Sequence, residues 1–153
     1  MPFVRIDLRE GQPASSVRAI SNAIHRALSE HFNVPAHDRF QIINEHKPEH
    51  LIYDPHYLDI ERTDAIVFIQ IFLRQGRTDK QKKAFYARVA ELLQENPGMR
   101  PQDVFIMLFE NTSADWTFGN GQAQMLEMSR EQWKRVRLST YFHVLDKERR
   151  KKG

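Results

Sequence analysis

The feature that most constrains this chain is an internal repeat. When the sequence is shifted by 65 positions, residues 2–46 align without gaps with residues 67–111. The identical pairs fall at apolar, glycine and turn positions, where backbone structure limits the choice of residue. They are Phe3 and Phe68, Ile6 and Ile71, Leu8 and Leu73, Arg9 and Arg74, Gly11 and Gly76, Ala19 and Ala84, Leu28 and Leu93, Glu30 and Glu95, Asp38 and Asp103, Phe40 and Phe105, and Glu45 and Glu110. We therefore expect one supersecondary unit used twice.

The first copy has the pattern of a strand, a helix and a second strand. Apolar residues alternate with charged residues over 3–9, which is typical of a strand with one exposed face. Pro13 suits the first turn of a helix, and apolar residues then follow helical spacing from Val17 to Phe32. Val34 and Pro35 end this helix, and residues 40–44 are expected to form the second strand.

The second copy follows the same plan. The nearly continuous apolar run 66–73 predicts a central strand that is covered on both faces. Thr78 and Gln81 form a capping box for a helix that stops at 96–98, and residues 104–109 form a further strand. Because such crossovers are right-handed, we expect an α/β (α+β) fold, in which two tandem β-α-β units form a four-stranded mixed sheet with two helices on one face.

Three segments lie outside the repeat. Residues 47–64 are predicted to be a linker with a short strand, residues 112–121 a turn-rich loop, and residues 123–149 largely helical. We accordingly assign residues 1–128 to a single domain and residues 129–153 to a helical, basic extension.

Composition excludes several classes of protein. The chain has no cysteine, which rules out disulfides, thiolate catalysis and cysteine-based zinc sites. Its longest apolar run, from Ala65 to Leu73, is too short to cross a membrane, and its charged beginning is unlike a signal peptide. We predict a cytoplasmic protein without a membrane partner.

The charge pattern does not favour a nucleic-acid partner. Residues 147–152 carry a net charge of +4, whereas the whole chain carries only +3, so the rest is close to neutral. The alternative, an interaction module that binds RNA through its sheet, would need aromatic residues clustered at alternating strand positions with flanking lysines, and this pattern is missing.

Pro2 is the first candidate for chemistry. Its repeat mate is Val67, so the proline belongs to the chain start and not to the strand pattern. Removal of an initiator methionine before proline would expose a secondary amine, and a free α-amino group titrates near pH ~8, within reach of acid–base work. Burial and nearby arginines would lower that pKa. The alternative is a proline without function.

Two arginines and an aspartate are further candidates. Arg74 ends the central strand and Arg77 lies just ahead of the second helix, where the two can bind a carboxylate or polarise a carbonyl. Solvated surface arginines are the alternative. Asp38 precedes the strand at 40–44 and can activate a water or orient a hydroxyl, or it can cap a turn as its repeat mate Asp103 suggests.

Trp116 and Phe118, flanked by glycines, are candidates for the wall of an apolar substrate pocket, with core packing as the alternative. The chain has seven histidines, and the closest group is His46, His50 and His56, which Pro48 interrupts. We predict no metal site and no cofactor.

Together these residues resemble the tautomerase superfamily, whose members are built from β-α-β units with a catalytic amino-terminal proline. Residues 71–82 resemble the segment of 4-oxalocrotonate tautomerase that carries its substrate-binding arginine, which falls on Arg77, and the aromatic residue of that pocket falls on Trp116. Residues 38–41 and 115–121 resemble the malonate semialdehyde decarboxylase branch. The resemblance covers roughly residues 2–126.

The resemblance implies a tautomerase acting on a small 2-keto or enol carboxylic acid. Pro2 would be the acid–base group, Arg74 and Arg77 would bind the substrate, and Asp38 would assist the addition of water. Decarboxylation, hydration or dehalogenation of a three-carbon acid is the alternative activity. The resemblance also implies a homotrimer. In this branch the two arginines are usually one residue apart, whereas Gln75 and Gly76 separate them here.

Overall fold

The computed structural model describes residues 1–136 and divides the chain into two units, Met1–Glu110 and the residues from Asn111 onward. We describe each unit by itself. The elements in chain order are β1 (Pro2–Arg9), α1 (Ala14–Phe32), β2 (Phe40–His46), β3 (Val67–Arg74), α2 (Asp79–Glu95), β4 (Val104–Asn111) and α3 (Gln124–Glu127), with short 3-10 turns at Pro48–His50, Tyr57–Asp59, Pro101–Asp103 and Ser113–Asp115.

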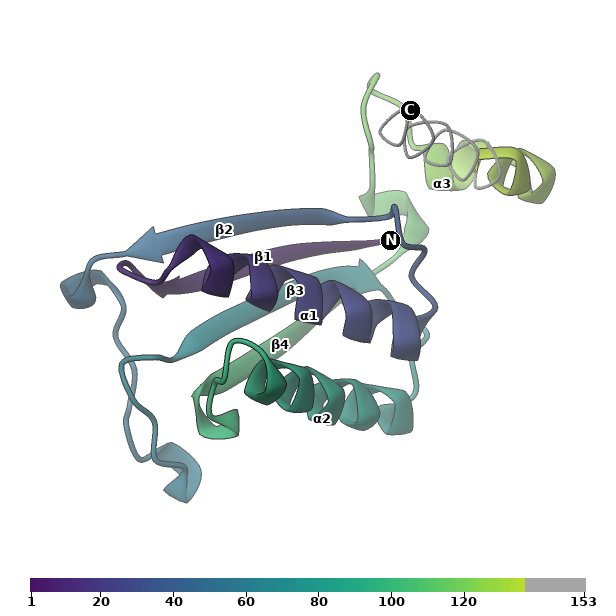
Figure 1. The fold of residues 1–153 in the computed structure, drawn as a ribbon. Helices are drawn as coiled ribbons and strands as arrows, with labels where there is room; N and C mark the ends of the chain where they lie inside the picture. The colour runs from purple at the N-terminus through teal and green to yellow at the C-terminus, as the bar shows by residue number, and fades with distance from the viewer. Residues whose placement is uncertain (137–153) are drawn as a thin grey trace, which may run out of the picture. The chain divides into compact units, whose positions relative to one another are not determined.

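The sheet is the mixed, four-stranded sheet that the repeat predicts, in the order β2-β1-β3-β4. Within the first copy β1 and β2 are parallel, and β1 lies antiparallel to β3, with Pro2 opposite Leu73. Figure 1 shows β4 running in the same direction as β3, and α1 and α2 covering one face of the sheet. Strands β1 and β3 occupy residue ranges that are offset by 65 positions, so the repeat in the sequence is also a repeat in the structure.

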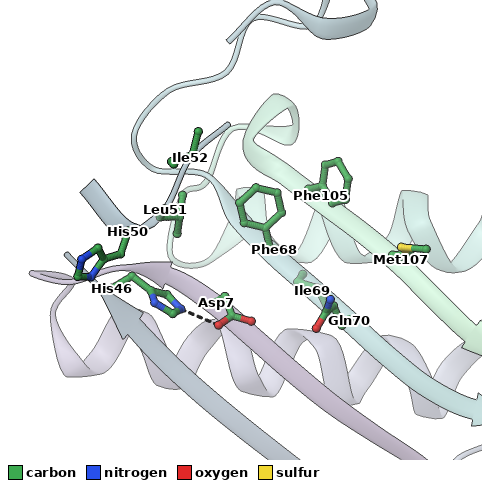
Figure 2. A pocket seen from close by; sticks show the side chains of 10 residues that line it. All are labelled: Asp7, His46, His50, Leu51, Ile52, Phe68, Ile69, Gln70, Phe105 and Met107. Carbon is green, nitrogen blue, oxygen red and sulfur yellow. Dashed lines mark hydrogen bonds and ion pairs between the residues drawn. The ribbon is translucent and has the colours of Figure 1, made fainter. Parts of the chain in front are cut away.

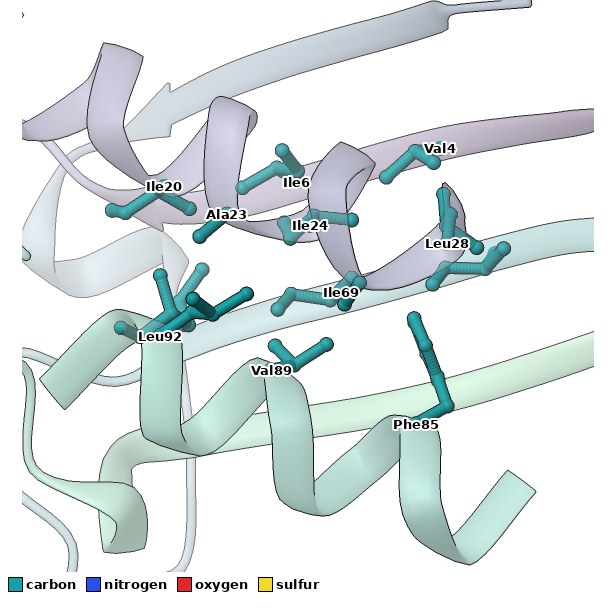
Figure 3. Close-up of a cluster of buried hydrophobic side chains, with 14 of the residues drawn as sticks. Val4, Ile6, Ile20, Ala23, Ile24, Leu28, Ile69, Phe85, Val89 and Leu92 are labelled. Carbon is teal, nitrogen blue, oxygen red and sulfur yellow. The ribbon is translucent and has the colours of Figure 1, made fainter. Parts of the chain in front are cut away.

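The core lies between the sheet and the two helices. Val4 and Ile6 of β1 point toward the helices and pack with apolar side chains of α1 and α2 such as Ile24 and Phe85 (Figure 3), and Leu8 belongs to the same buried cluster. Each of these side chains is at least 97 % buried, and burying one contributes about 1.5–3 kcal/mol. This core fixes the faces of β1 and β3, and therefore the place where the chain begins.

Within the unit Met1–Glu110, no helix covers the other face of the sheet, which we call the open face. Strand β3 is central, as predicted, but only its helix-facing residues are buried, so the predicted cover on both faces is not present within the described chain. Phe40 of β2 and Met107 of β4 are 51 % and 50 % exposed on this open face. Aromatic rings also contact each other there, and the centroids of Phe72 and Phe109 are 4.6 Å apart.

A shallow pocket lies on the open face, toward the carboxyl end of β1. Figure 2 shows Asp7 and His46 at its edge, where His46 Nε2 lies 2.6 Å from Asp7 Oδ1. Apolar side chains such as Phe68 and Met107 form most of the remaining lining, together with His50 and Gln70. Because Asp7 and Pro2 point to opposite faces of β1, this pocket is separate from the start of the chain.

Residues 47–64 form no strand, contrary to the prediction. Hydrogen bonds within the segment hold it as an irregular loop, because the Arg62 guanidinium donates to the carbonyls of Tyr57 and Ile60, and the Tyr53 hydroxyl donates to Asp64. Side chains of the segment thus provide hydrogen-bond partners for its backbone carbonyls, which a neighbouring strand would otherwise supply.

The helical prediction for residues 123–149 is correct only in part. Helix α3 has four residues, the helical conformation is interrupted at Met128 and Ser129, and it resumes at 130–136. The remainder of the predicted segment lies outside the described residues. In the part of the chain that is described, no helix is both long and apolar enough to span a membrane.

Candidate active site

The chain begins in the middle of the sheet. Pro2 is the first residue of β1, is buried, and pairs with Leu73 near the end of β3. The amine of Met1, one residue before it, lies 3.5 Å from Asp38 Oδ2. The amino terminus is therefore held in a protein environment and not in free solution.

Asp38 reaches this place through the connection between α1 and β2. Helix α1 ends at Phe32 and is capped by Asn33, which adopts a left-handed conformation with φ of 54°. A turn follows in which the Asp38 N–H donates to the Pro35 carbonyl over 3.0 Å. The Asp38 side chain is only 9 % exposed. Its carboxylate therefore faces the start of β1 from within the fold.

The repeat mate of Asp38 has a different environment. Asp103 is fully buried, and its carboxylate accepts hydrogen bonds from the Thr63 backbone N–H at 2.6 Å and from the Thr63 hydroxyl at 2.7 Å. It thus holds the loop that enters β3. The sequence left open a catalytic role and a structural role for Asp38, the latter by analogy with Asp103. Asp103 has the structural role, whereas Asp38 lies beside the chain terminus.

Arg74 and Arg77 come together despite the two residues between them. Gly76 has φ of 119°, a conformation that strongly favours glycine, and it turns the chain from β3 toward α2. After this turn Arg77 Nη1 donates a hydrogen bond to the Arg74 carbonyl, and its guanidinium lies over the Phe32 ring at 5.4 Å from the centroid. The end of β3 lies beside the start of the chain, since Pro2 pairs with Leu73. The positive charges of both arginines therefore act on the Met1 amine.

The electrostatics of the terminus favour a neutral amine. Burial has the largest effect and lowers the pKa of the Met1 amine below that of an ordinary α-amino group. The Asp38 carboxylate raises the pKa, whereas the positive charges of Arg77 and Arg74 lower it further. The ion pair with Asp38 is therefore outweighed, and the net shift is downward. The pKa of Arg77 is itself lowered, first by burial and then by Arg74.

Trp116 and Phe118 lie in the second unit. Their rings stack with centroids 5.6 Å apart, and Trp116 Nε1 donates to Asn111 Oδ1 over 2.6 Å. Both side chains are half-buried. That they form a wall of the substrate pocket stays a prediction.

Sequence reasoning missed three residues around this site: His25, Phe32 and Lys82. Lys82 forms an ion pair with Glu110, whose charge also acts on Arg77. A signal for His25 was present, because a histidine on the apolar stripe of a predicted helix requires a polar partner. Within residues 1–136 no group of three or more histidine, aspartate or glutamate side chains is arranged to hold a metal ion.

Comparison with known proteins defines the class. Two family models, both described as "Tautomerase enzyme", match residues 2–59 and 38–119. "Probable tautomerase YusQ" of Bacillus subtilis (strain 168) is 46% identical over 127 residues, which cover 83% of this chain and 100% of the relative. "Probable tautomerase YrdN" of the same organism is 36% identical and covers 82% of this chain and 97% of the relative.

Solved structures agree. A malonate semialdehyde decarboxylase has a TM-score of 0.76 at 33% identity, covering 81% of this chain and 95% of that structure. FG41 malonate semialdehyde decarboxylase, solved with 3-bromopropiolate as inhibitor, has a TM-score of 0.76 at 39% identity, covering 81% and 94%. A fused 4-OT, described as a symmetric trimer, shares the fold with a TM-score of 0.67 at 19% identity, covering 82% and 99%. The chain belongs to the tautomerase family and is an enzyme of that family.

Proposed function

We propose that this enzyme interconverts the enol and keto forms of a small 2-keto carboxylic acid, with Pro2 as the general acid–base group after removal of Met1. The observation that carries the proposal is the convergence of the chain start, Asp38, Arg74 and Arg77 at one end of the sheet. An amine of lowered pKa beside two guanidinium groups can both move a proton and bind a carboxylate.

The proposed reaction is a proton transfer in two steps. The neutral Pro2 nitrogen takes the proton from the enol hydroxyl, and the resulting enolate takes the same proton back at carbon, which gives the keto acid. Arg74 and Arg77 hold the carboxylate and stabilise the enolate charge as it forms. No step requires a metal or a cofactor.

The test begins with the intact mass of the purified chain. A chain that retains Met1 has its Pro2 nitrogen in an amide bond and should be inactive, whereas a chain that begins at Pro2 should ketonise phenylenolpyruvate. If a chain that begins at Pro2 does not raise the rate of phenylenolpyruvate ketonisation above the uncatalysed rate, the proposed tautomerase activity is wrong.

A second activity is favoured by the position of Asp38. The Asp38 carboxylate raises the pKa of the Met1 amine. After removal of Met1 the same carboxylate would favour a protonated Pro2, against the opposite effects of burial and of the two arginines. Two solved relatives above 30% identity are malonate semialdehyde decarboxylases. In such a reaction protonated Pro2 would polarise the aldehyde oxygen while the bond to the carboxylate carbon breaks, carbon dioxide leaves, and the enolate takes up a proton to give acetaldehyde.

Asp38→Asn should separate the two activities. Asp38 raises the pKa of the Met1 amine, so loss of its negative charge should lower the pKa of the Pro2 amine in the processed enzyme. Because the base must be unprotonated, the limb of the ketonisation profile that rises with pH should then move to lower pH. Decarboxylation of malonate semialdehyde, which needs the protonated amine, should fall by about 100-fold or more. Asp54→Asn, in the exposed loop, is the matched control and should change neither profile. Equal losses of both activities in Asp38→Asn would argue against a specific role for the carboxylate.

We further propose a homotrimer that is held together by the open sheet face. That face carries exposed apolar side chains on β2 and β4, an arrangement that marks an interaction surface. One structural neighbour is described as a symmetric trimer. A partner's contacts would supply the second-face cover that the apolar sequence of β3 predicts.

Met107→Glu should therefore break the assembly. Light scattering on the wild-type enzyme should give three times the mass of one chain, and Met107→Glu should give the mass of one, because a charge would be buried at the interface. Tyr86→Glu, on the helix side of the fold, is the control and should remain a trimer. If the Met107→Glu enzyme is still a trimer, the subunit interface does not include this part of β4.

A further inference from the structure

Helix α1 buries two polar side chains among its apolar ones. Ser21 and His25 are each 8% exposed, and with Asp103 they are the buried polar or charged residues found in positions 1–136. They lie four residues apart and thus on one side of the helix, one turn from each other. Burying polar groups costs free energy unless they are hydrogen-bonded, so their partners show what they stabilise.

The partner of His25 belongs to the segment that leads to Asp38. His25 Nε2 lies 2.9 Å from the carbonyl oxygen of Ala36. A carbonyl only accepts, so Nε2 carries the hydrogen and donates it. Burial lowers the pKa of His25 and so favours the neutral ring. This bond holds the chain two residues before Asp38.

The residues after Asp38 are held by the same stretch of the helix. Arg39 Nη2 donates to Ser21 Oγ at 2.5 Å and to Asn22 Oδ1 at 2.7 Å. The Gln41 side chain donates to the Ser21 carbonyl at 3.2 Å. The segment 36–41 is therefore fixed to α1 on both sides of the aspartate.

We infer that His25 is a positioning residue for Asp38, which keeps the carboxylate beside the terminal amine by holding the Ala36 carbonyl. This inference rests on the proposed function, since it concerns the same site. Residues 36 and 37 are themselves exposed, so the hydrogen bond from His25 ties an exposed stretch of chain to the buried side of α1. His25 acts through Asp38 and does not reach the substrate.

The first test is a pair of substitutions, His25→Leu and His25→Gln. Leucine keeps the bulk but removes the donor, whereas the glutamine amide nitrogen can replace Nε2. In His25→Leu, the pKa of the Pro2 amine, followed by NMR on the processed chain, should shift down as in Asp38→Asn. The ratio of malonate semialdehyde decarboxylation to phenylenolpyruvate ketonisation should fall by roughly 10- to 100-fold, because catalytic groups tolerate little displacement. His25→Gln should restore both values.

A double substitution shows whether the effect passes through Asp38. His25→Leu combined with Asp38→Asn should be no worse than Asp38→Asn alone, since the two changes remove one interaction. His31→Leu, on the same helix, is the control and should leave the amine pKa unchanged. Should His25→Leu not fold, His25→Asn, whose amide is too short to reach Ala36, replaces it.

Three results would overturn the inference: an unchanged amine pKa in His25→Leu, an unchanged ratio of activities, or losses that add fully in the double variant. The failure of the proposed function looks different. If the wild-type enzyme converts neither substrate, the activity assignment fails, while the NMR measurement still decides whether His25 positions Asp38.

Discussion

Replacing Pro2 by alanine should reduce kcat/KM for phenylenolpyruvate ketonisation by about 100- to 10,000-fold, the range expected for loss of a positioned acid–base group. The variant still presents a terminal amine, but a primary one without the ring that fixes the nitrogen at the start of β1. The proton acceptor would then be displaced from the two guanidinium groups. The effect should appear mainly in kcat, because carboxylate binding by Arg74 and Arg77 is retained.

The matched control for this experiment is Pro13→Ala. Pro13 is an exposed proline that precedes α1, so its replacement tests whether the loss of any proline near the amino terminus reduces activity. Circular dichroism and intact mass should be the same for both variants and the wild type. A Pro2→Ala enzyme with activity within about threefold of the wild type, after confirmed removal of Met1, would show that the proline ring is not required for catalysis.

Arg77→Ala should cost about 100- to 1,000-fold in kcat/KM, comparable to removing one charge-stabilising donor from an active site. Arg77 is half-buried, lies over Phe32 and is tied to the Arg74 carbonyl, so its fork is held in place before substrate arrives. Arg77→Lys keeps the charge but loses the planar pair of donors, so it should recover only part of the lost kcat/KM. The remaining defect should appear mainly as a raised KM.

Arg18→Ala, at an exposed position of α1, is the matched control and should leave the kinetics unchanged. The same measurements at two salt concentrations add a second check, because a general effect of positive charge is screened by salt whereas a bidentate contact in a buried site is screened much less. If Arg77→Ala and Arg18→Ala behave alike, the guanidinium of Arg77 does not bind the substrate.

The fold followed from the sequence because its periodicities repeat. The alternation of Val4, Ile6 and Leu8 and its copy in β3 determine which faces are buried, and the capping box at Thr78 gives the start of α2 where the structure has it. The segment 47–64 was harder, because its conformation depends on side-chain bonds to backbone carbonyls, such as those of Arg62, that leave no periodic pattern.

The candidate site was predictable where chain order constrains geometry. Pro2 begins a strand that pairs antiparallel with β3, so the end of β3, with Arg74, necessarily lies near the terminus. Asp38 was ambiguous because its repeat mate Asp103 has the other role, and only the three-dimensional contacts separate them. The cation–π contact between Arg77 and Phe32 joins separate elements and had no signature in the sequence.

The duplicated fold also sets the number of reactive groups. In the second copy the nitrogen equivalent to that of Pro2 belongs to Val67, which lies inside a continuous chain and is therefore an amide. However many subunits assemble, each polypeptide from which Met1 has been removed contributes a single secondary amine, the terminal nitrogen of Pro2. An electrophile that is specific for this nitrogen should therefore reach a labelling stoichiometry of one per chain, and the two halves cannot substitute for each other.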